Sequence, residues 1–481
     1  AKAWFWGPDG NKIAFYRFDE SRVKQYTLQE WDDIYPDNIS YKYPKAGEQN
    51  AIVDIGVHHL KKDTTVWMDH GDTDNAYIVR IDWTHDPNKL AIRRMNRLQN
   101  RQDLMLADAR TGETSGLKTE ESSTWIEEND DLTFLENGNE FIYVSEESGY
   151  NHIYHYRIDG KLIRQVTKGA WEVSKFFGFD EVNNQLYFSS TEESPLQNHL
   201  YRINLNGQNK KKLTTGTGWH NIKMNPQLTY YIDSYSRANK PPEITLFDKS
   251  GEPVRKLIEN DDLADTIDDK NMPQKEFLTL QVDDTVSLNS YMIKPPDFDK
   301  NKKYPVLVYV YGGPGSQLVV DRYSGGQRET WHRHLSEQGY IIFTVDNRGT
   351  GGRGAEFKKM VYKNLGHYET KDQIAAANYL KTLDYVDPQR IGIWGWSYGG
   401  YMSSLALARG GDTFKMAMAV APVSDWRFYD TIYTERYMQT PQQNPEGYES
   451  SSVLNEVGGL KRKNYLLVHG TGDDNVHVQN T

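Results

Sequence analysis

The sequence predicts a two-domain protein in which a β-propeller precedes an α/β domain built on a mostly parallel sheet. Up to about residue 275, short apolar segments alternate with turns rich in glycine, asparagine and aspartate, as in all-β folds. Beyond that point, short apolar runs alternate with segments of helical spacing, which is typical of a parallel sheet covered on both faces. We therefore expect domains at 1–275 and 276–481, a division that suits a chain of 481 residues.

The first domain is expected to consist of short strands joined by tight turns. Strands are predicted where β-branched and aromatic residues cluster, at 13–16, 77–81, 90–92, 141–144, 153–156 and 185–188. An aromatic or apolar residue, a turn and an apolar strand recur at 6–15, 83–92 and 134–143. Such a repeat suits the four-stranded blades of a propeller, and an array of β-sandwiches is the alternative.

The second domain is expected to open with a strand pair and to continue as an α/β alternation. The strand pair is predicted at 277–282 and 288–293. Later strands are predicted at 306–311, 341–345, 391–394, 416–420 and 465–469, and helices at 330–338, 371–380 and 401–409. Active groups of such sheets gather beyond the carboxyl ends of the strands, so the residues that follow each strand are the site candidates.

The strand at 391–394 leads into the pentapeptide Gly395-Trp396-Ser397-Tyr398-Gly399. Gly-x-Ser-x-Gly between a strand and a helix is typical of a nucleophile elbow, in which a sharp turn exposes the serine hydroxyl beside a helix N-terminus. Side chains two residues on either side of Ser397 would collide in so sharp a turn. We predict that Ser397 is a nucleophile; the alternative is a glycine-rich turn that holds an ordinary serine.

Glycine-rich turns follow two other strands. Tyr311 opens the first, at 311–315, where its hydroxyl would be placed to donate to a developing oxyanion. A tight turn with a packing tyrosine explains these residues equally well. The second, at 346–354, matches neither a phosphate-binding loop nor a dinucleotide fingerprint, so we expect it to support the nucleophile.

Asp473 follows the last predicted strand and is the candidate acid. In α/β-hydrolases the acid lies at a strand end downstream of the serine, where it orients the imidazole of the base. The alternative is a solvated turn or a helix cap. The base should follow the acid, but His477 lies four residues further on the same loop and His469 sits at the strand end. Neither is well placed to serve both Asp473 and Ser397, so we expect the catalytic histidine beyond Thr481.

Aromatic residues cluster after the strand that follows the elbow helix. Trp426, Tyr429, Tyr433 and Tyr437 recur at helical spacing, so one helical face would line a flat apolar pocket. An aromatic face packed into the core is the alternative.

Composition excludes several classes of function. The formal net charge of −11 argues against nucleic acid and against an anionic membrane surface as partners. The chain has no cysteine, which excludes disulfides, thiolate catalysis and cysteine zinc sites. No run approaches about 18 consecutive apolar residues, so we expect no transmembrane helix within this chain. We expect neither a metal nor a cofactor.

These motifs together resemble the prolyl oligopeptidase family of serine peptidases. The likeness rests on 395–401, on the Tyr311 turn, on Asp346-x-Arg348-Gly349 and on 469–477. The run 429–438 resembles the dipeptidyl peptidase branch of that family, in a bacterial form. The resemblance covers essentially the whole chain. It is close over 300–481 and looser before, where 43–47 and 167–173 are also similar.

The resemblance implies a role for each matching residue. Ser397 would be the nucleophile and Asp473 the acid, while the Tyr311 hydroxyl and the Tyr398 backbone N–H would form the oxyanion hole. Asn475 and Arg436 would hold the substrate carbonyl near the scissile bond. The S1 pocket, which accepts proline, would be lined by Val423, Trp426, Tyr429, Tyr433 and Val476.

The resemblance also implies an activity, the release of N-terminal X-Pro or X-Ala dipeptides from peptides through an acyl-enzyme. A related aminopeptidase or oligopeptidase of the family is one alternative, and a non-catalytic homologue that binds peptides or proteins is another. Relatives are often homodimers and exported to the periplasm or cell surface, and we expect the same of the whole protein. No targeting segment stands in this chain.

The family's eight-bladed propeller and its paired glutamates, which bind the substrate's amino terminus, imply sequence upstream of Ala1. Glu192-Glu193 has no matching motif around it and is a poor substitute. We therefore expect a partial, N-terminally truncated propeller, a C-terminally incomplete α/β-hydrolase domain, and a chain that is inactive by itself.

Overall fold

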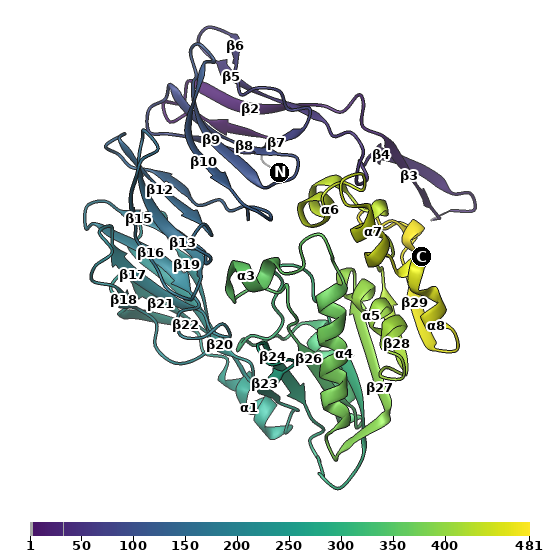
Figure 1. The fold of residues 1–481 in the computed structure, drawn as a ribbon. Helices are drawn as coiled ribbons and strands as arrows, with labels where there is room; N and C mark the ends of the chain where they lie inside the picture. Colours follow the sequence, from purple (N-terminus) through teal and green to yellow (C-terminus); the bar gives the residue numbers. More distant parts are fainter. Residues whose placement is uncertain (1–2, 32) are drawn as a thin grey trace. The chain divides into compact units, whose positions relative to one another are not determined.

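The computed structural model describes residues 3–31 and 33–481 of the chain (Figure 1). The chain forms two compact units, and each is assembled from segments that are distant in sequence. The first unit contains the residues up to Lys168 together with Arg427–Pro445, and the second contains Gly169–Trp426 and Glu446–Thr481. Within the described residues, no helix is both long and apolar enough to cross a membrane.

Three antiparallel sheets of four strands make up most of the first unit. Successive strands are mostly neighbours in each sheet, as in a propeller blade. The first sheet is interrupted by the β3–β4 hairpin, Gln25–Glu30 and Asp37–Lys42. The strands of the three sheets are β1 (Trp4–Trp6), β2 (Lys12–Asp19), β5 (Ile52–His59) and β6 (Thr64–Trp67); β7 (Ala76–Trp83), β8 (Lys89–Asn96), β9 (Arg101–Asp108) and β10 (Thr114–Glu121); and β11 (Leu132–Phe134), β12 (Glu140–Ser145), β13 (His152–Arg157) and β14 (Leu162–Gln165).

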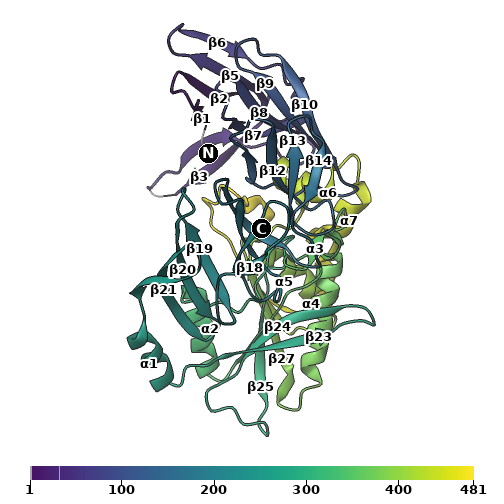
Figure 2. The ribbon, with the colours of Figure 1, turned by 90° about the vertical axis from the view of Figure 1, so that its left-hand side faces the viewer.

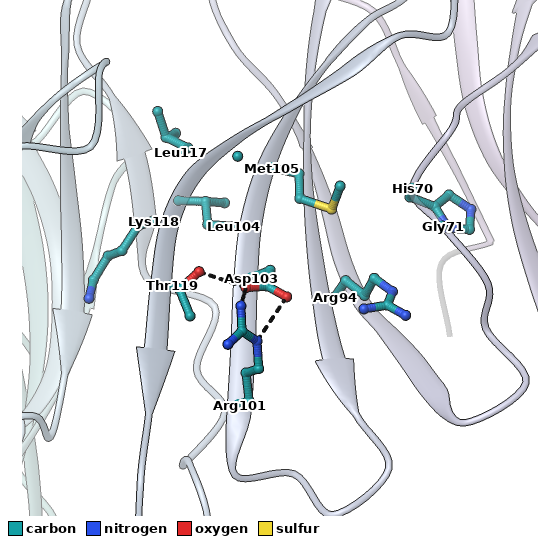
Figure 3. A pocket seen from close by; sticks show the side chains of 11 residues that line it. His70, Gly71, Arg94, Arg101, Asp103, Leu104, Met105, Leu117, Lys118 and Thr119 are labelled. Carbon is teal, nitrogen blue, oxygen red and sulfur yellow. Dashed lines mark hydrogen bonds and ion pairs between the residues drawn. The ribbon is translucent and has the colours of Figure 1, made fainter.

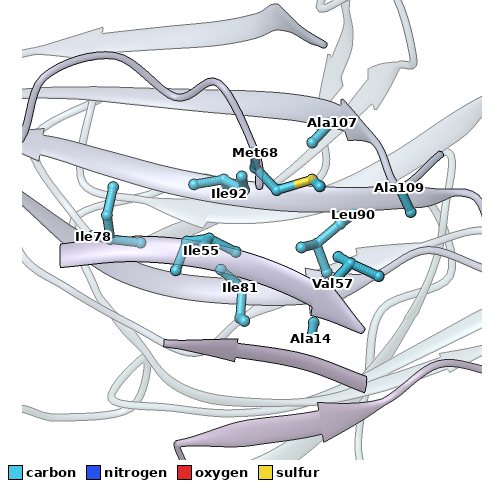
Figure 4. Close-up of a cluster of buried hydrophobic side chains, with 10 residues drawn as sticks. All are labelled: Ala14, Ile55, Val57, Met68, Ile78, Ile81, Leu90, Ile92, Ala107 and Ala109. Carbon is cyan, nitrogen blue, oxygen red and sulfur yellow. The ribbon is translucent and has the colours of Figure 1, made fainter. Parts of the chain in front are cut away.

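The first two sheets pack face to face around a shared apolar core (Figure 4). Successive side chains of a strand point to opposite faces, so alternate residues such as Ile55 and Val57 face the same side. Both are fully buried, as are Ile81 and Leu90 of the neighbouring sheet. The remaining buried members of the cluster are Ala14, Met68, Ile78, Ile92, Ala107 and Ala109.

Two further four-stranded sheets begin the second unit. Their strands are β15 (Val173–Asp180), β16 (Gln185–Ser190), β17 (His199–Asn204) and β18 (Lys211–Lys212), then β19 (Trp219–Met224), β20 (Tyr230–Arg237), β21 (Lys240–Asp248) and β22 (Pro253–Ile258). The same histidine–threonine contact occurs in two of the sheets. His152 Nδ1 lies 3.0 Å from the Thr167 hydroxyl, and His199 Nδ1 lies 3.2 Å from the Thr214 hydroxyl. The sheets and this repeated contact are consistent with propeller blades.

The remainder of the second unit contains a seven-stranded sheet in the order β23-β24-β26-β25-β27-β28-β29. Pairing is antiparallel from β23 to β26 and parallel across the other neighbours. The strands are β23 (Lys275–Gln281), β24 (Ser287–Ile293), β25 (Tyr304–Tyr309), β26 (Ile341–Val345), β27 (Val386–Trp396), β28 (Met416–Val420) and β29 (Asn464–Val468). This is the α/β sheet that the sequence predicts.

The strand order places helices on both faces of this sheet. The chain steps from β25 to β26 in one direction and from β26 to β27 in the other, so right-handed crossovers put the two connecting helices on opposite faces. Figure 2 shows α2 (Gln327–Glu337) on one side and α4 (His367–Lys381) and α5 (Tyr398–Arg409) on the other. All three helices occupy positions where the sequence predicts one.

Several short helices are not apparent from the sequence pattern. None of them is longer than nine residues, so each has too few turns for a helical period to repeat clearly. They are α1 (Asp261–Asp269), α3 (Gly354–Lys359), α7 (Pro445–Ser451), α8 (Val457–Leu460), and the 3-10 turns Val453–Glu456 and Val478–Asn480.

The single aromatic helical face predicted from Trp426 to Tyr437 is wrong. Trp426 belongs to a separate 3-10 turn, Trp426–Phe428, and α6 covers only Thr431–Met438. Asp430 breaks the helix, because its backbone is extended and its side chain caps the new N-terminus by accepting the N–H of Tyr433 at 2.8 Å. Trp426 belongs to the second unit and Tyr437 to the first.

Candidate active site

Ser397 lies in a strained turn between β27 and α5. Its φ of 57° and ψ of −118° are rarely adopted by a non-glycine residue and cost about 1–3 kcal/mol. Two backbone hydrogen bonds hold this conformation: the Ser397 N–H donates to Val420 O at 2.9 Å, and the Tyr401 N–H donates to Ser397 O at 3.0 Å. The turn therefore has the backbone geometry of a nucleophile elbow, with the serine at a helix N-terminus.

Glycines flank Ser397 because β25 runs directly against the turn. A Cβ added at Gly399 would lie 2.2 Å from the carbonyl oxygen of Val310, and one added at Gly395 would lie 2.4 Å from the same atom. Both distances are shorter than any van der Waals contact. The glycines thus permit a close approach between the elbow and the strand end that carries Tyr311.

Replacing Gly399 with alanine is expected to destabilise the second unit, although alanine favours helix over glycine by about 1 kcal/mol. The clash with the Val310 carbonyl should outweigh this gain and cost about 1–3 kcal/mol. Urea unfolding followed by circular dichroism measures the change. Gly458→Ala in α8 is the matched control, because an added Cβ there meets nothing within 4 Å. A Gly399→Ala variant as stable as wild type would contradict the close approach.

Tyr311 and Tyr398 lie side by side, with ring centroids 6.1 Å apart. Gly313 allows this approach, because a Cβ added there would lie 3.0 Å from Tyr311 Cε1 and 3.1 Å from Tyr398 Cγ. Burial raises the pKa of the Tyr311 phenol, so it keeps its proton at neutral pH and remains a hydrogen-bond donor.

The loop after β26 supports the Tyr311 turn rather than the serine directly. The Asn347 side-chain amide donates to Gly312 O at 3.0 Å, and Gln373 of α4 donates to Asn347 Oδ1 at 3.0 Å. The Asp346 carboxylate accepts the N–H groups of Leu318 and Val319, and burial raises its pKa to about 6. The loop thus fixes the segment that carries Tyr311.

Two of the predicted S1 residues follow β28 in the second unit. Val423 and Trp426 are 2% and 1% exposed. The Trp426 ring lies 5.5 Å from the ring of Tyr398 and 5.2 Å from that of Tyr401. The structure therefore brings Trp426 next to the residue that follows Ser397.

Asp473 lies in a compact loop after β29. Its Oδ1 accepts the N–H groups of Asn475 and Val476 at 3.1 and 2.9 Å, and its side chain is 25% exposed. Val476 is buried. His469 Nε2 lies 3.7 Å from Asp473 Oδ2 and 2.6 Å from Val476 O, and its Nδ1 lies 2.6 Å from the Thr481 hydroxyl. His477 is fully buried.

Tyr429, Tyr433 and Arg436 belong to the first unit, on and before α6. The rings of Tyr429 and Tyr433 meet edge to face at 5.4 Å. Arg436 Nε donates to Gln99 Oε1 at 2.7 Å, and Gln99 Nε2 donates to Ile432 O at 2.6 Å. Gln99 is 1% exposed and holds a positive φ of 57°, so a strained turn after β8 secures the helix that carries Arg436.

A second contact that secures α6 involves Arg97. Its guanidinium donates to both carboxylate oxygens of Glu435, at 2.6 and 2.7 Å, and Glu435 is fully buried. Sequence reasoning missed Arg97 and Gln99. The only local signal is their place in the polar turn 96–100, and their partners lie more than 300 residues further along the chain.

Arg436 and Gln99 line a cavity of about 490 Å³ in the first unit, together with Tyr77, Glu128 and Ile432. Burial raises the pKa of the Glu128 carboxyl to about 7. This cavity is mainly apolar, with charged groups at a few points, which is common for ligand sites.

Another cavity, of about 620 Å³, lies against the second sheet of the first unit (Figure 3). Among its lining residues, Arg101 and Asp103 of the same strand pair at 3.1 Å, and the Thr119 hydroxyl donates to Asp103. None of the predicted site residues lines it. Among the described residues, no three histidine, aspartate or glutamate side chains gather as metal ligands.

A serine in a strained strand-to-helix turn of a parallel sheet, within a chain that also forms propeller-type sheets, defines an α/β-hydrolase with a β-propeller. Residues 1–242 match the family model described as the dipeptidyl peptidase IV (DPP IV) N-terminal region, and residues 328–481 match that of the prolyl oligopeptidase family. The chain belongs to the prolyl oligopeptidase family of serine peptidases, and its first 242 residues belong to the dipeptidyl peptidase IV N-terminal region.

Two relatives illustrate the likeness. Dipeptidyl aminopeptidase B of Saccharomyces cerevisiae is 36% identical over 524 residues, which cover 100% of this chain and 63% of that protein. The crystal structure of Porphyromonas gingivalis dipeptidyl peptidase 4 superposes with a TM-score of 0.94 at 40% identity, over 99% of this chain and 67% of that one. The chain thus spans less than two thirds of the yeast protein.

Proposed function

We propose that the protein containing this chain is a serine dipeptidyl peptidase that releases N-terminal X-Pro or X-Ala dipeptides from peptides. The observation that carries this proposal is the strained Ser397 turn at the N-terminus of α5 in a chain of this family. The names of the relatives support the same reaction class.

In the proposed reaction, Ser397 Oγ attacks the scissile carbonyl and its proton passes to a histidine, which we place beyond Thr481. The negative charge on the carbonyl oxygen is stabilised by the Tyr398 N–H and the Tyr311 hydroxyl, and one such donor is worth about 2.7–4 kcal/mol. The histidine returns the proton to the leaving amine, which leaves a dipeptidyl ester on Ser397. Water then hydrolyses the ester, while Asp473 orients the histidine.

We propose that substrate recognition uses the residues that the family resemblance implies. Val423, Trp426, Tyr429, Tyr433 and Val476 would line the proline pocket. Asn475 and Arg436 would hold the substrate carbonyl, and the Gln99 contact would keep the Arg436 side chain in place. Flat aromatic walls suit the compact ring of proline.

We also propose that the boundary between the two domains in the sequence lies near residue 275, where the seven-stranded sheet begins with β23. Each domain of this chain would be part of a larger domain in the whole protein. The chain alone is then inactive, because the histidine and the amine-binding glutamates lie outside it. The chain's 63% share of the yeast relative supports this. The complete reading frame tests the histidine, the glutamates and a signal for export together.

Homodimerisation of the whole protein is the proposed quaternary state. Trp31, Ile34 and Tyr35, in the connection of the β3–β4 hairpin, are 60%, 87% and 83% exposed. Burying such apolar side chains is what an association between copies would achieve. Sedimentation of the whole protein tests this, and a monomer at micromolar concentration would contradict it.

A substrate panel with the whole protein tests the proposed activity. Dipeptide amides with proline or alanine before the scissile bond should be hydrolysed, and the same amides with a blocked amino terminus should not. A fluorophosphonate probe should label Ser397, as peptide mapping would show. Turnover of blocked substrates would favour an oligopeptidase. Absence of both labelling and turnover would favour a non-catalytic binding protein.

A further inference from the structure

A buried carboxyl group lies directly behind the serine turn. Glu369, in the first turn of α4, is fully buried, and its Oε1 accepts the hydroxyl of Tyr398 at 2.7 Å. Tyr398 is itself only 2% exposed. Carboxyl groups are seldom fully buried without a polar partner, and the partner here is the residue that follows Ser397.

The groups around Glu369 determine the pKa of its carboxyl. Burial raises its pKa to about 7, against the opposing effect of a backbone hydrogen bond at Gly366 and of the Tyr398 hydroxyl. Asp372 on the same helix adds a like charge, although the guanidinium of Arg348 pairs with Asp372 at 2.6 Å. From α5, the facing titratable groups are Tyr398 and Tyr401, and Arg409 acts on Tyr401.

The Tyr398 ring connects this carboxyl to the groups around the serine. Its centroid lies 6.1 Å from that of Tyr311, 5.5 Å from Trp426 and 5.4 Å from Tyr401. As the first residue of α5, Tyr398 presents its backbone N–H at the helix N-terminus. A hydrogen bond at the far end of the side chain limits rotation of the ring and of the backbone that bears it.

We infer that Glu369 is a positioning residue for the oxyanion hole. Its hydrogen bond to Tyr398 keeps the Tyr398 N–H and the Tyr311 hydroxyl directed at one point. This rests on the function proposed for Ser397, Tyr311 and Tyr398. Glu369 touches no substrate, so its effect appears in the chemical step rather than in binding of the ground state.

Steady-state kinetics of the whole protein with a Gly-Pro amide tests the inference. Glu369→Gln keeps the side-chain volume and weakens the hydrogen bond by removing the charge of its acceptor, and Tyr398→Phe removes the donor of the same bond. Each should lower kcat about tenfold, the effect of about 1.4 kcal/mol of lost transition-state stabilisation, and leave KM within about twofold. Glu337→Gln, whose carboxylate on α2 is 46% exposed, is the control.

The double variant separates one shared bond from two independent defects. If both residues act through one hydrogen bond, the Glu369→Gln/Tyr398→Phe protein should be no slower than the slower single variant. Losses that multiply, a kcat within about twofold of wild type, or a rise in KM that matches the fall in kcat would each overturn the inference. Ser397→Ala belongs in the same series. Activity retained by that variant would refute the proposed function itself, whereas its loss beside a normal Glu369→Gln kcat would refute only the positioning role.

A readout that is independent of activity is the pH dependence of stability. The folded-state pKa of Glu369 is raised from about 4.5 to about 7, so between these values the folded state binds more protons than the unfolded state. Stability therefore falls as pH rises through this window. The Glu369→Gln variant should show a shallower fall in urea unfolding, and an unchanged slope would contradict the buried carboxyl on which the inference depends.

Discussion

Replacing Ser397 with alanine is expected to lower the kcat of the whole protein for an X-Pro amide by about 10⁶-fold. The reason is that the substitution removes Oγ, the atom that forms the ester intermediate. The histidine and Asp473 then have no nucleophile to activate. Residual catalysis of about 10³–10⁴-fold over water should remain, because the oxyanion donors and the binding pocket are intact. Initial rates at saturating concentrations of an amide that resists spontaneous hydrolysis measure the loss of kcat.

Ser404→Ala is the matched control for this change. Ser404 lies on α5 as well, and its hydroxyl donates to Gly400 O at 2.8 Å without belonging to the elbow. It should retain kcat within about an order of magnitude of wild type. A Ser397→Ala protein that keeps even about one hundredth of the wild-type rate would exclude Ser397 as the nucleophile.

The fold and the position of the nucleophile could be predicted because their signals are local. A strand, a Gly-x-Ser-x-Gly turn and a helix follow one another between Val386 and Arg409, and the clash at Gly395 and Gly399 follows from the sharpness of the turn. The α/β alternation after residue 275 likewise follows from runs of apolar residues, and each long helix occupies a predicted place.

The residues that support the site could not be predicted, since their partners are distant in sequence. Glu369 lies 29 residues before Tyr398, and Gln99 lies 337 residues before Arg436. Nothing in the local pattern distinguishes Glu369 from an ordinary acidic residue in the first turn of a helix, where a negative charge interacts favourably with the helix dipole. Pairing across such separations is decided by tertiary packing alone.

The aromatic segment shows how a helical period can mislead. Trp426, Tyr429, Tyr433 and Tyr437 keep the spacing of one helical face, yet the chain leaves the helical conformation between Phe428 and Thr431. The signal that was available is Asp430, a good N-cap residue that stands three residues before Tyr433. Its capping contact marks a helix start and not a helix interior.

Replacing Arg97 with methionine is expected to destabilise α6 by about 3–5 kcal/mol, the usual cost of removing one partner from a buried ion pair. Arg97 donates to both oxygens of Glu435, and the hydrogen bond raises the pKa of the guanidinium. Without Arg97, the fully buried Glu435 would retain the backbone N–H of Gly47, at 2.7 Å, but no cation at its carboxylate. Hydrogen exchange of the 431–438 amides should then accelerate, which mass spectrometry can follow.

The double variant Arg97→Met/Glu435→Met should recover most of this loss, because replacing both members of a buried pair with apolar side chains is often neutral or stabilising. Arg101→Met controls for the lost charge: Arg101 is half exposed, pairs with Asp103 and Glu121, and should cost at most about 1 kcal/mol. Because α6 carries Tyr433 and Arg436, Arg97→Met should also raise KM for the proline substrate in the whole protein more than it lowers kcat. Unchanged hydrogen exchange in α6 would show that the Arg97–Glu435 pair does not stabilise the helix. A fall in kcat at constant KM would show that α6 does not contribute to substrate binding.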